Sequence, residues 1–266
     1  MIPYIELPVY QLGPIPIDPW GTLVCIGFIL GLEMARARGI KTGLDVRDVV
    51  DGIVATVLTG FVVGHLVHVL AYNPQKLEEE GVMALVRVWA GFSSFGGFIG
   101  AVLGSAIFYK LVRKRDYFAH ADAIMFGFPF GWIFGRLGCF SVHDHIGKPT
   151  DFFLAVNFPA NHWTGGGPRF DLGLLEALVA MVIGAVFLAL ARTPRVPGTF
   201  LATWGLLYAP ARFGLDFLRN SDLRGADVRW AGFTPAQWGC VVMFAGSLAL
   251  LAYLRSRGSA GQVAAA

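Results

Sequence analysis

Residues 118–134 read FAHADAIMFGFPFGWIF, and residues 135–159 continue as GRLGCFSVHDHIGKPTDFFLAVNFP. The first stretch is mostly apolar and approaches the length that crosses a bilayer. The second stretch carries Arg136 at the end of this apolar run and then gathers His143, Asp144 and His145 in three consecutive positions. Ionisable groups so close to a hydrocarbon boundary are costly, and they are therefore candidates for function.

The composition is that of a membrane protein. Of the 266 residues, 55% are hydrophobic and only 15% are charged, whereas soluble domains carry about 25% charged residues. We predict an all-α integral membrane protein, with residues 1–266 forming a single membrane domain and residues 136–171 an extracytoplasmic loop or subdomain within it. The net charge of +3 lies mainly in one set of loops. Nothing resembles a basic stripe with interleaved aromatic residues, so we expect no nucleic-acid partner.

The apolar stretches predict about seven transmembrane helices. They cover residues 20–37, 50–72, 95–111, 118–134, 172–191, 200–217 and 238–254. Lys and Arg favour cytoplasmic loops, and twelve of them gather in loops 36–47, 110–115 and 192–195 and in the tail from residue 255. The opposite side spreads eight over far longer segments: Lys76, Arg87, Arg136, Lys148, Arg169, Arg219, Arg224 and Arg229. The N-terminus is therefore expected outside and the C-terminus in the cytoplasm.

This orientation places several cations near the outer leaflet. Trp20, Arg136 and Arg219 fall there, and Arg212 lies about two turns deeper in the sixth predicted span, at about 1.5 Å per residue. An anionic phosphate is the natural ligand of such a site, because the guanidinium group binds phosphate through two parallel hydrogen bonds. The alternative for Arg136 is a snorkelling anchor at the interface.

The end of the sixth span carries a polar stripe. Its members recur at i, i+4, i+8 and i+11 and so share one helical face: Tyr208, Arg212, Asp216 and Arg219. A polar stripe in a membrane helix usually faces a water-filled or ligand-binding cavity. The alternative is an ion-pair seam that only fixes helix packing.

Two further motifs also have alternative interpretations. His143 or His145 could act as a general base oriented by Asp144, or the triplet could be a solvated loop. A metal site would need a third ligand, which is not evident. The glycines near position 100 include G-x-x-x-G spacing, which favours close packing of helices.

Taken in order, these segments resemble the prolipoprotein diacylglyceryl transferase family over roughly residues 18–255. The most specific part is 135–159, which is similar to the family pattern G-R-x-G-(N/C)-F…G-(K/R)-P-T…W-A-V-x-F-P. Residues 208–219 resemble Y-x-x-x-R-F-x-x-E-x-x-R, and VWAGFSSFGGFIGA at 88–101 resembles W-x-G-x-x-S-x-H-G-G-x-I-G.

The resemblance implies a transferase of the bacterial cytoplasmic (inner) membrane. In the family's reaction, the lipobox cysteine thiol of a preprotein attacks the glyceryl carbon of phosphatidylglycerol, and glycerol phosphate leaves. Phosphatidylglycerol, lipobox-containing preproteins and membrane lipids are the implied partners, with no cofactor and no metal. Arg136 and Arg212 would hold the phosphate, Asp216 and Arg219 would support them, and Tyr208 would line the pocket. Further substrate-binding candidates are Gly96, Gly97, Cys139, Asp144 and Gly147, together with Trp20, which stands where the family usually has a tyrosine.

The chain also departs from the family pattern. The histidine before the Gly-Gly pair aligns with Phe95, which takes no proton, and Asp216 stands in place of a glutamate. We therefore hypothesise that His143 or His145 replaces the missing base. The alternative is a catalytically impaired paralogue that binds phospholipid. A transporter is a third possibility, but the chain shows neither broken-helix signals nor inverted halves.

Overall fold

The computed structural model describes residues 1–223 and 229–263. Arg224, one of the eight cations expected on the outer side, lies outside them. The chain divides into two compact units, Met1–Met34 with Met125–Ala266 and, separately, Ala35–Ile124. The expectation of one membrane domain with a loop subdomain stays a prediction.

The described chain is mostly helical, as the sequence predicts. Each of the seven predicted spans coincides with a helix. Five helical segments of the described chain are long and apolar enough to cross a membrane: Val46–Tyr72, Phe95–Val112, Tyr117–Val142, Leu172–Leu190 and Pro235–Ser256. The remaining two predicted spans correspond to α1 (Pro19–Lys41) and to the 17-residue α8 (Thr199–Leu215). The seven-span arrangement and its orientation stay predictions.

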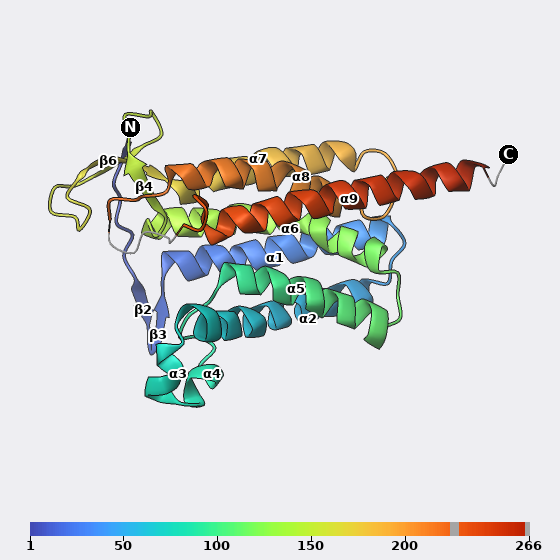
Figure 1. Ribbon diagram of the computed structural model, residues 1–266, viewed down its shortest axis with the longest axis horizontal. Coiled ribbons are helices and arrows are strands. Elements are labelled where there is room, and N and C mark those ends of the chain that lie inside the picture. Colours follow the sequence, from blue (N-terminus) through green and yellow to red (C-terminus); the bar gives the residue numbers. More distant parts are fainter. Residues whose placement is uncertain (224–228, 264–266) are drawn as a thin grey trace. The chain divides into compact units, whose positions relative to one another are not determined.

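The first unit is built on a helical core. In Figure 1, α7 (Leu172–Leu190), α8 and α9 (Pro235–Val263) run alongside the C-terminal part of α6 (Tyr117–Val142). Aromatic and aliphatic side chains fill the space between α6, α7 and α8: Phe126, Ile183, Phe187, Phe200, Trp204 and Tyr208. This core holds α6, α7 and α8 together, and these helices carry most of the site.

Glycines bring α1 and α6 close together within the first unit. A Cβ atom at Gly27 would lie 2.6 Å from the Gly131 carbonyl oxygen, and one at Gly131 would lie 2.8 Å from the Gly27 carbonyl oxygen. Small residues let helix backbones approach in this way in membrane proteins. Asp18 starts α1, because its carboxylate accepts the backbone N–H of Gly21 at 2.8 Å.

A small sheet caps the first unit, and the sequence did not predict it. Its strand order is β1 (Ile2–Pro3), β5 (Val156–Phe158), β6 (Gly167–Asp171) and β4 (Ile146–Pro149), with β1 parallel to β5 and the other pairs antiparallel. The strands are too short for alternating hydrophobicity to reveal them. A separate hairpin joins β2 (Tyr10–Leu12) and β3 (Ile15–Ile17). The all-α class is therefore correct for the bulk of the chain but incomplete.

The second unit is a glycine-packed helix pair with short connecting helices. The pair is formed by α2 (Val46–Val67) and α5 (Ser94–Ile107), extended by η1 (His68–Tyr72) and η2 (Phe108–Val112); α3 (Gln75–Glu80) and α4 (Met83–Val86) connect them. A Cβ atom at Gly100 would lie 2.5 Å from the Thr59 carbonyl oxygen, and one at Gly96 would lie 2.6 Å from Val67 Cβ. This contact confirms the close helix packing predicted from the G-x-x-x-G spacing.

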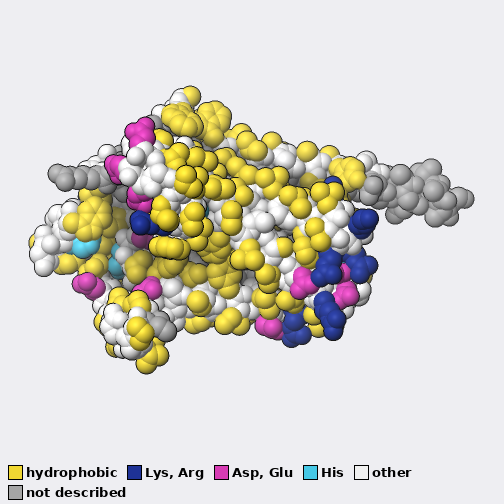
Figure 2. Space-filling model, turned by 90° about the horizontal axis from the view of Figure 1, so that it is seen from below, with side chains coloured by type: hydrophobic (Ala, Val, Ile, Leu, Met, Phe, Trp, Pro, Cys, Tyr) yellow, Lys and Arg dark blue, Asp and Glu magenta, His cyan; other side chains and the backbone are white. Residues whose placement is uncertain are grey.

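The outer surfaces of the helices are strongly apolar. Large exposed hydrophobic side chains include Leu58 at 60% on α2, Val182 at 65% on α7 and Val242 at 72% on α9. Figure 2 shows hydrophobic side chains over much of the visible surface. Such wide apolar surfaces fit contact with lipid chains and not with water.

Candidate active site: a buried arginine–carboxylate cluster

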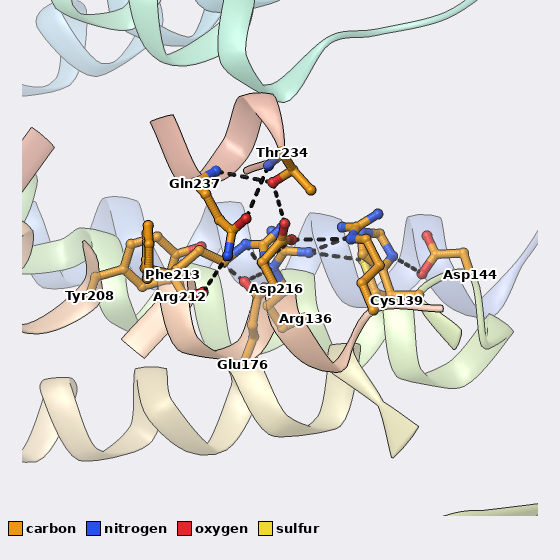
Figure 3. A network of polar contacts seen from close by, with 12 residues as sticks. Arg136, Cys139, Asp144, Glu176, Tyr208, Arg212, Phe213, Asp216, Thr234 and Gln237 are labelled. Carbon is orange, nitrogen blue, oxygen red and sulfur yellow. Dashed lines mark hydrogen bonds and ion pairs between the residues drawn. The ribbon is translucent and has the colours of Figure 1, made fainter. Parts of the chain in front are cut away.

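Glu176 is the centre of the polar cluster in the first unit. It lies on α7, is fully buried at 0% exposure, and sits among the residues drawn in Figure 3. Its Oε2 atom lies 3.0 Å from Arg136 Nε and accepts the Tyr208 hydroxyl at 2.9 Å, and its Oε1 atom lies 3.2 Å from Arg212 Nε. One carboxylate thus joins two arginines and a tyrosine from α6 and α8. Buried charges require such pairing, because desolvation costs several kcal/mol per ion.

The second carboxylate of the cluster is Asp216, at the end of α8 in η3 (Asp216–Leu218). It has 0% exposure and accepts Arg212 Nη1 at 2.7 Å, while Arg219 Nε lies 3.2 Å away. The Thr234 hydroxyl also donates to it. The polar stripe predicted on one face of the sixth span is therefore real, and it is turned inward.

Thr234 connects this carboxylate to the start of α9. The Thr234 hydroxyl accepts the backbone N–H of Gln237 at 3.2 Å, and the Gln237 side chain accepts the Thr234 N–H at 3.0 Å. This reciprocal pair is a capping box, and Pro235 takes the first helical position, where its missing N–H costs nothing. Gln237 also donates to the Phe213 carbonyl at 3.1 Å. The cap of α9 thereby fixes the end of α8.

Both central arginines keep hydrogen-bonding capacity. Among the described residues, neither Arg136 Nη2 nor Arg212 Nη2 donates a hydrogen bond, because the contacts of both side chains run through Nε and Nη1. The two side chains are only 11% and 10% exposed. The Arg136 guanidinium also lies 4.5 Å over the Trp132 ring, which favours a cation there. The cluster therefore offers rigidly held N–H donors.

Three donor side chains meet beside Arg136. The ligand-forming atoms of Cys139, Asp144 and His145 lie within 4.8 Å of one another, which is the third ligand that sequence spacing did not reveal. However, His145 already uses both ring nitrogens: Nδ1 lies 2.5 Å from Asp144 Oδ1 and Nε2 lies 3.3 Å from Arg136 Nη1. The positive charge of Arg136 also disfavours a cation at this point. Arg136, His145 and Asp144 therefore form a series of hydrogen bonds beside the Cys139 thiol.

His143 points elsewhere. Its Nδ1 lies 2.7 Å from Asp171 Oδ2, and its ring packs 5.0 Å from Tyr4 and 5.4 Å from Phe158. Asp171 also accepts the Leu174 N–H at 3.2 Å, which caps α7. Burial raises the pKa of the Asp171 carboxyl, and the hydrogen bond from His143 opposes that rise. His143 thus joins the sheet to the start of α7 and, within the described chain, makes no hydrogen bond or ion pair with the arginines of the cluster.

Gly147 lies where β4 meets the chain after α8. It pairs with Arg219 in an isolated antiparallel bridge, and a Cβ atom there would lie 2.6 Å from the Leu218 carbonyl oxygen. Only a residue without a side chain fits this approach. Arg169 donates to the Gly147 carbonyl at 3.2 Å and pairs with Asp222 at 2.5 Å. This part of the sheet positions Arg219.

The remaining candidates take no part in the ion pairs of the cluster, and two of them lie in the second unit. Trp20 is 43% exposed near the start of α1, and a Cβ atom at Gly138 would lie 3.4 Å from its indole Cδ1. Gly96 and Gly97 lie in the second unit, where they pack against Val67 and Phe92. The proposed substrate-binding role of these three residues stays a prediction.

Sequence reasoning missed the central residue, Glu176, as a site residue. The available signal was a single carboxylate in a helix of 19 otherwise apolar or small residues. It also missed Thr234 and Gln237, although T-P-A-Q has the capping-box spacing.

The fold and the site together describe a class of protein: a helical membrane protein in which arginines and carboxylates are buried together near a small sheet. Comparison with known proteins identifies the family. The sequence model of prolipoprotein diacylglyceryl transferase matches residues 8–253. The chain belongs to this family.

Individual relatives carry a more specific name. This chain is similar to the phosphatidylglycerol–prolipoprotein diacylglyceryl transferases of three bacteria. The identity is 30% with that of Photobacterium profundum, over 94% of each chain. It is 31% with that of Bordetella bronchiseptica, over 91% of this chain and 92% of the relative. For Vibrio vulnificus it is 31%, over 96% of this chain and 94% of the relative.

Proposed function

We propose that this chain transfers a diacylglyceryl group from phosphatidylglycerol to the lipobox cysteine of prolipoproteins. The family membership and the names of relatives that align over most of the chain support this activity. The proposal extends to the lipobox as the acceptor and to the outer leaflet of the bacterial cytoplasmic membrane as the place of reaction.

The observation that carries the proposal is the sharing of Glu176 by Arg136 and Arg212. The cluster holds three guanidinium groups and two carboxylates, so its formal charge is one positive. A phosphodiester carries one negative charge and would balance it. The Nη2 groups of Arg136 and Arg212 can donate to phosphate oxygens, because no described residue occupies them.

The chemistry needs such donors at the leaving group. When the thiol attacks the glyceryl carbon, the carbon–oxygen bond breaks and negative charge grows on the departing glycerol phosphate. Donors already fixed in a dry site stabilise that charge without reorganising. Glu176 and Asp216 hold the arginines in place and prevent their mutual repulsion, and Tyr208 fixes Glu176 through its hydroxyl.

We further propose seven spans, with the N-terminus outside and the C-terminus in the cytoplasm. The density of Lys and Arg in loops 36–47 and 110–115 supports this arrangement. Reporter fusions test it. A periplasmic alkaline phosphatase fused after residue 155 should be active, and one fused after residue 115 should be inactive.

Complementation tests the activity itself. In cells depleted of their own transferase, the chain should restore lipoprotein modification, and Arg212→Lys should fail while reaching the membrane in equal amount. If the wild-type chain is present in the membrane and restores nothing, the catalytically impaired phospholipid-binding paralogue, suggested by Phe95, replaces this proposal.

A further inference from the structure

The structure separates the two histidines that the sequence left as alternatives. His143 is 7% exposed at its side chain, lies at φ 50°, and is committed to Asp171. His145 is 24% exposed and lies beside the arginine cluster. Only His145 combines access to a substrate with contact to Arg136.

The hydrogen bonds of His145 fix its tautomer. An arginine side chain has donors and no acceptor. Because Arg136 Nη1 lies 3.3 Å from His145 Nε2, that nitrogen accepts and carries no proton. The proton is then on Nδ1 and is donated to Asp144 Oδ1 at 2.5 Å. His145 is thus a neutral imidazole with its basic nitrogen facing the phosphate-binding arginine.

We propose that His145 takes the proton of the substrate thiol and that Asp144 orients it. This inference rests on the proposed transferase function. The same order of groups, a carboxylate on one imidazole nitrogen and a reacting proton on the other, activates nucleophiles in hydrolases. Phe95, at the position of the family's histidine, cannot perform this step.

In the transfer step, the thiol proton passes to His145 Nε2, and the sulfur electron pair forms the bond to the glyceryl carbon. The carbon–oxygen bond to phosphate breaks, and its electron pair stays on the glycerol phosphate. His145 then returns its proton to that phosphate or to water. Asp144 stabilises the imidazolium between these two transfers.

Arg136 connects lipid binding to this base. While Arg136 Nη1 donates to His145 Nε2, the nitrogen cannot accept another proton. A phosphate that binds the unoccupied Arg136 Nη2 can also accept from Nη1, which releases His145 Nε2, and its charge offsets the repulsion between Arg136 and a protonated His145. Phospholipid therefore has to bind before the thiol is deprotonated.

The ionisable groups around His145 come from two elements. From α6 and the turn after it, Arg136, Cys139 and Asp144 face the ring. From the start of α7, Asp171 acts on it electrostatically, and the Leu172 N–H holds the His145 carbonyl at 2.9 Å. The charges of these groups therefore influence the pH dependence of catalysis by His145.

The test is the pH profile of His145→Gln, with phosphatidylglycerol and a lipobox peptide in proteoliposomes. We expect kcat to fall by roughly 10²-fold or more at pH 7, the usual size of a general-base contribution. The KM for phosphatidylglycerol should change by less than about threefold, because the phosphate donors remain. The variant's rate should then rise with the thiolate fraction through about pH 8.5, where a free thiol is half ionised, and level off above it. The wild-type rate should change much less over this range.

Two further variants make the result specific. Asp144→Asn should lower kcat by roughly 10-fold or more, since the orienting charge is lost. His162→Gln is the matched control, because this histidine lies in the loop before β6, 2.9 Å from Thr164 Oγ1. It should keep the rate and pH profile of the wild type. Added imidazole should partly restore His145→Ala.

Two results would overturn the inference. One is a His145→Gln rate within about threefold of the wild-type rate at pH 7, well inside the range expected for a lost base. The other is an equal loss at pH 7 and pH 9.5 with no rescue by imidazole, which indicates a structural role. A wild-type protein that transfers nothing would instead refute the proposed function.

Discussion

Arg136 Nε lies 3.0 Å from Glu176 Oε2, and the two side chains are 11% and 1% exposed. The same carboxylate lies 3.2 Å from Arg212 Nε, so α7 holds guanidinium groups from both α6 and α8. Removing one member of a buried ion pair leaves the others uncompensated. The packing of these helices and the orientation of both guanidinium groups therefore depend on Glu176.

Glu176→Gln should lower both stability and activity. The amide keeps the shape but leaves Arg136 without a carboxylate partner in the cluster and Arg212 with Asp216 alone. We expect a loss of about 3–5 kcal/mol in the free energy of unfolding, the usual cost of breaking a buried pair. Thermal and denaturant unfolding in detergent measures it. A stability equal to that of the wild type would show that the arginines have another counter-ion.

Tyr208→Phe separates the carboxylate from its neutral partner. This change removes only the hydroxyl that donates to Glu176 at 2.9 Å. The loss should be about 1.5–3 kcal/mol, as for one hydrogen bond to a charged group. It should be smaller than that of Glu176→Gln in the same unfolding assay. The reverse order would contradict the central place given to Glu176.

Thr234→Val tests the link between α9 and the cluster. The variant loses both the cap of α9 and the hydroxyl donated to Asp216. The cap alone is worth about 1 kcal/mol, and a larger loss is expected because Asp216 also loses a donor. Thr234→Ser keeps the hydroxyl and should restore most of the stability. If serine and valine behave alike, the hydroxyl contributes nothing.

Most of the helical fold follows from the sequence for a simple physical reason. Apolar runs such as 172–191 are long and uninterrupted, and a bilayer permits a spanning chain little except helix. The polar stripe Tyr208–Arg219 is equally readable, because helical periodicity alone puts its members on one face. Both depend only on local spacing.

The centre of the site depends on contacts between distant segments. Glu176 meets Arg136 and Arg212 across 40 and 36 positions of sequence, so no local pattern predicts the shared carboxylate. The different roles of His143 and His145 also depend on a distant contact. Asp171 lies 28 positions from His143 and accepts its hydrogen bond, which keeps His143 away from the arginines.

Gly147→Ala should lower activity through Arg219. The added methyl group would approach the Leu218 carbonyl oxygen to 2.6 Å and Phe170 Cβ to 2.7 Å, so the paired backbones must separate. Arg219 would move with them and weaken its contact with Asp216. Transfer activity should fall by about tenfold, equivalent to about 1.4 kcal/mol of transition-state stabilisation. Gly165→Ala has open space around the new Cβ but lies at φ +80°. It therefore reports backbone strain in the same subdomain without the clash.

Asp222→Asn should remove an acid-sensitive part of the stability. The hydrogen bond from Arg169 lowers the pKa of the Asp222 carboxyl, which favours its charged form in the folded chain. A lowered folded pKa adds stability above the unfolded value of about 3.9, and this stability is lost as the pH falls through the folded pKa. The free energy of unfolding of the wild type, measured by denaturant titration, should exceed that of the variant at pH 6. The difference should shrink towards pH 3. A difference that is constant with pH would contradict the pairing.

The most direct test of the account is transfer of radiolabel from phosphatidylglycerol, labelled in its diacylglyceryl part, to a lipobox peptide by the purified protein. The wild type should label the peptide. Arg136→Lys should reduce the rate by roughly 10²-fold or more while remaining folded, because lysine lacks the planar fork that meets both Glu176 and a phosphate. An unlabelled peptide with the wild type, or an Arg136→Lys rate within about threefold of it, far short of the loss expected for such a donor, would contradict the account.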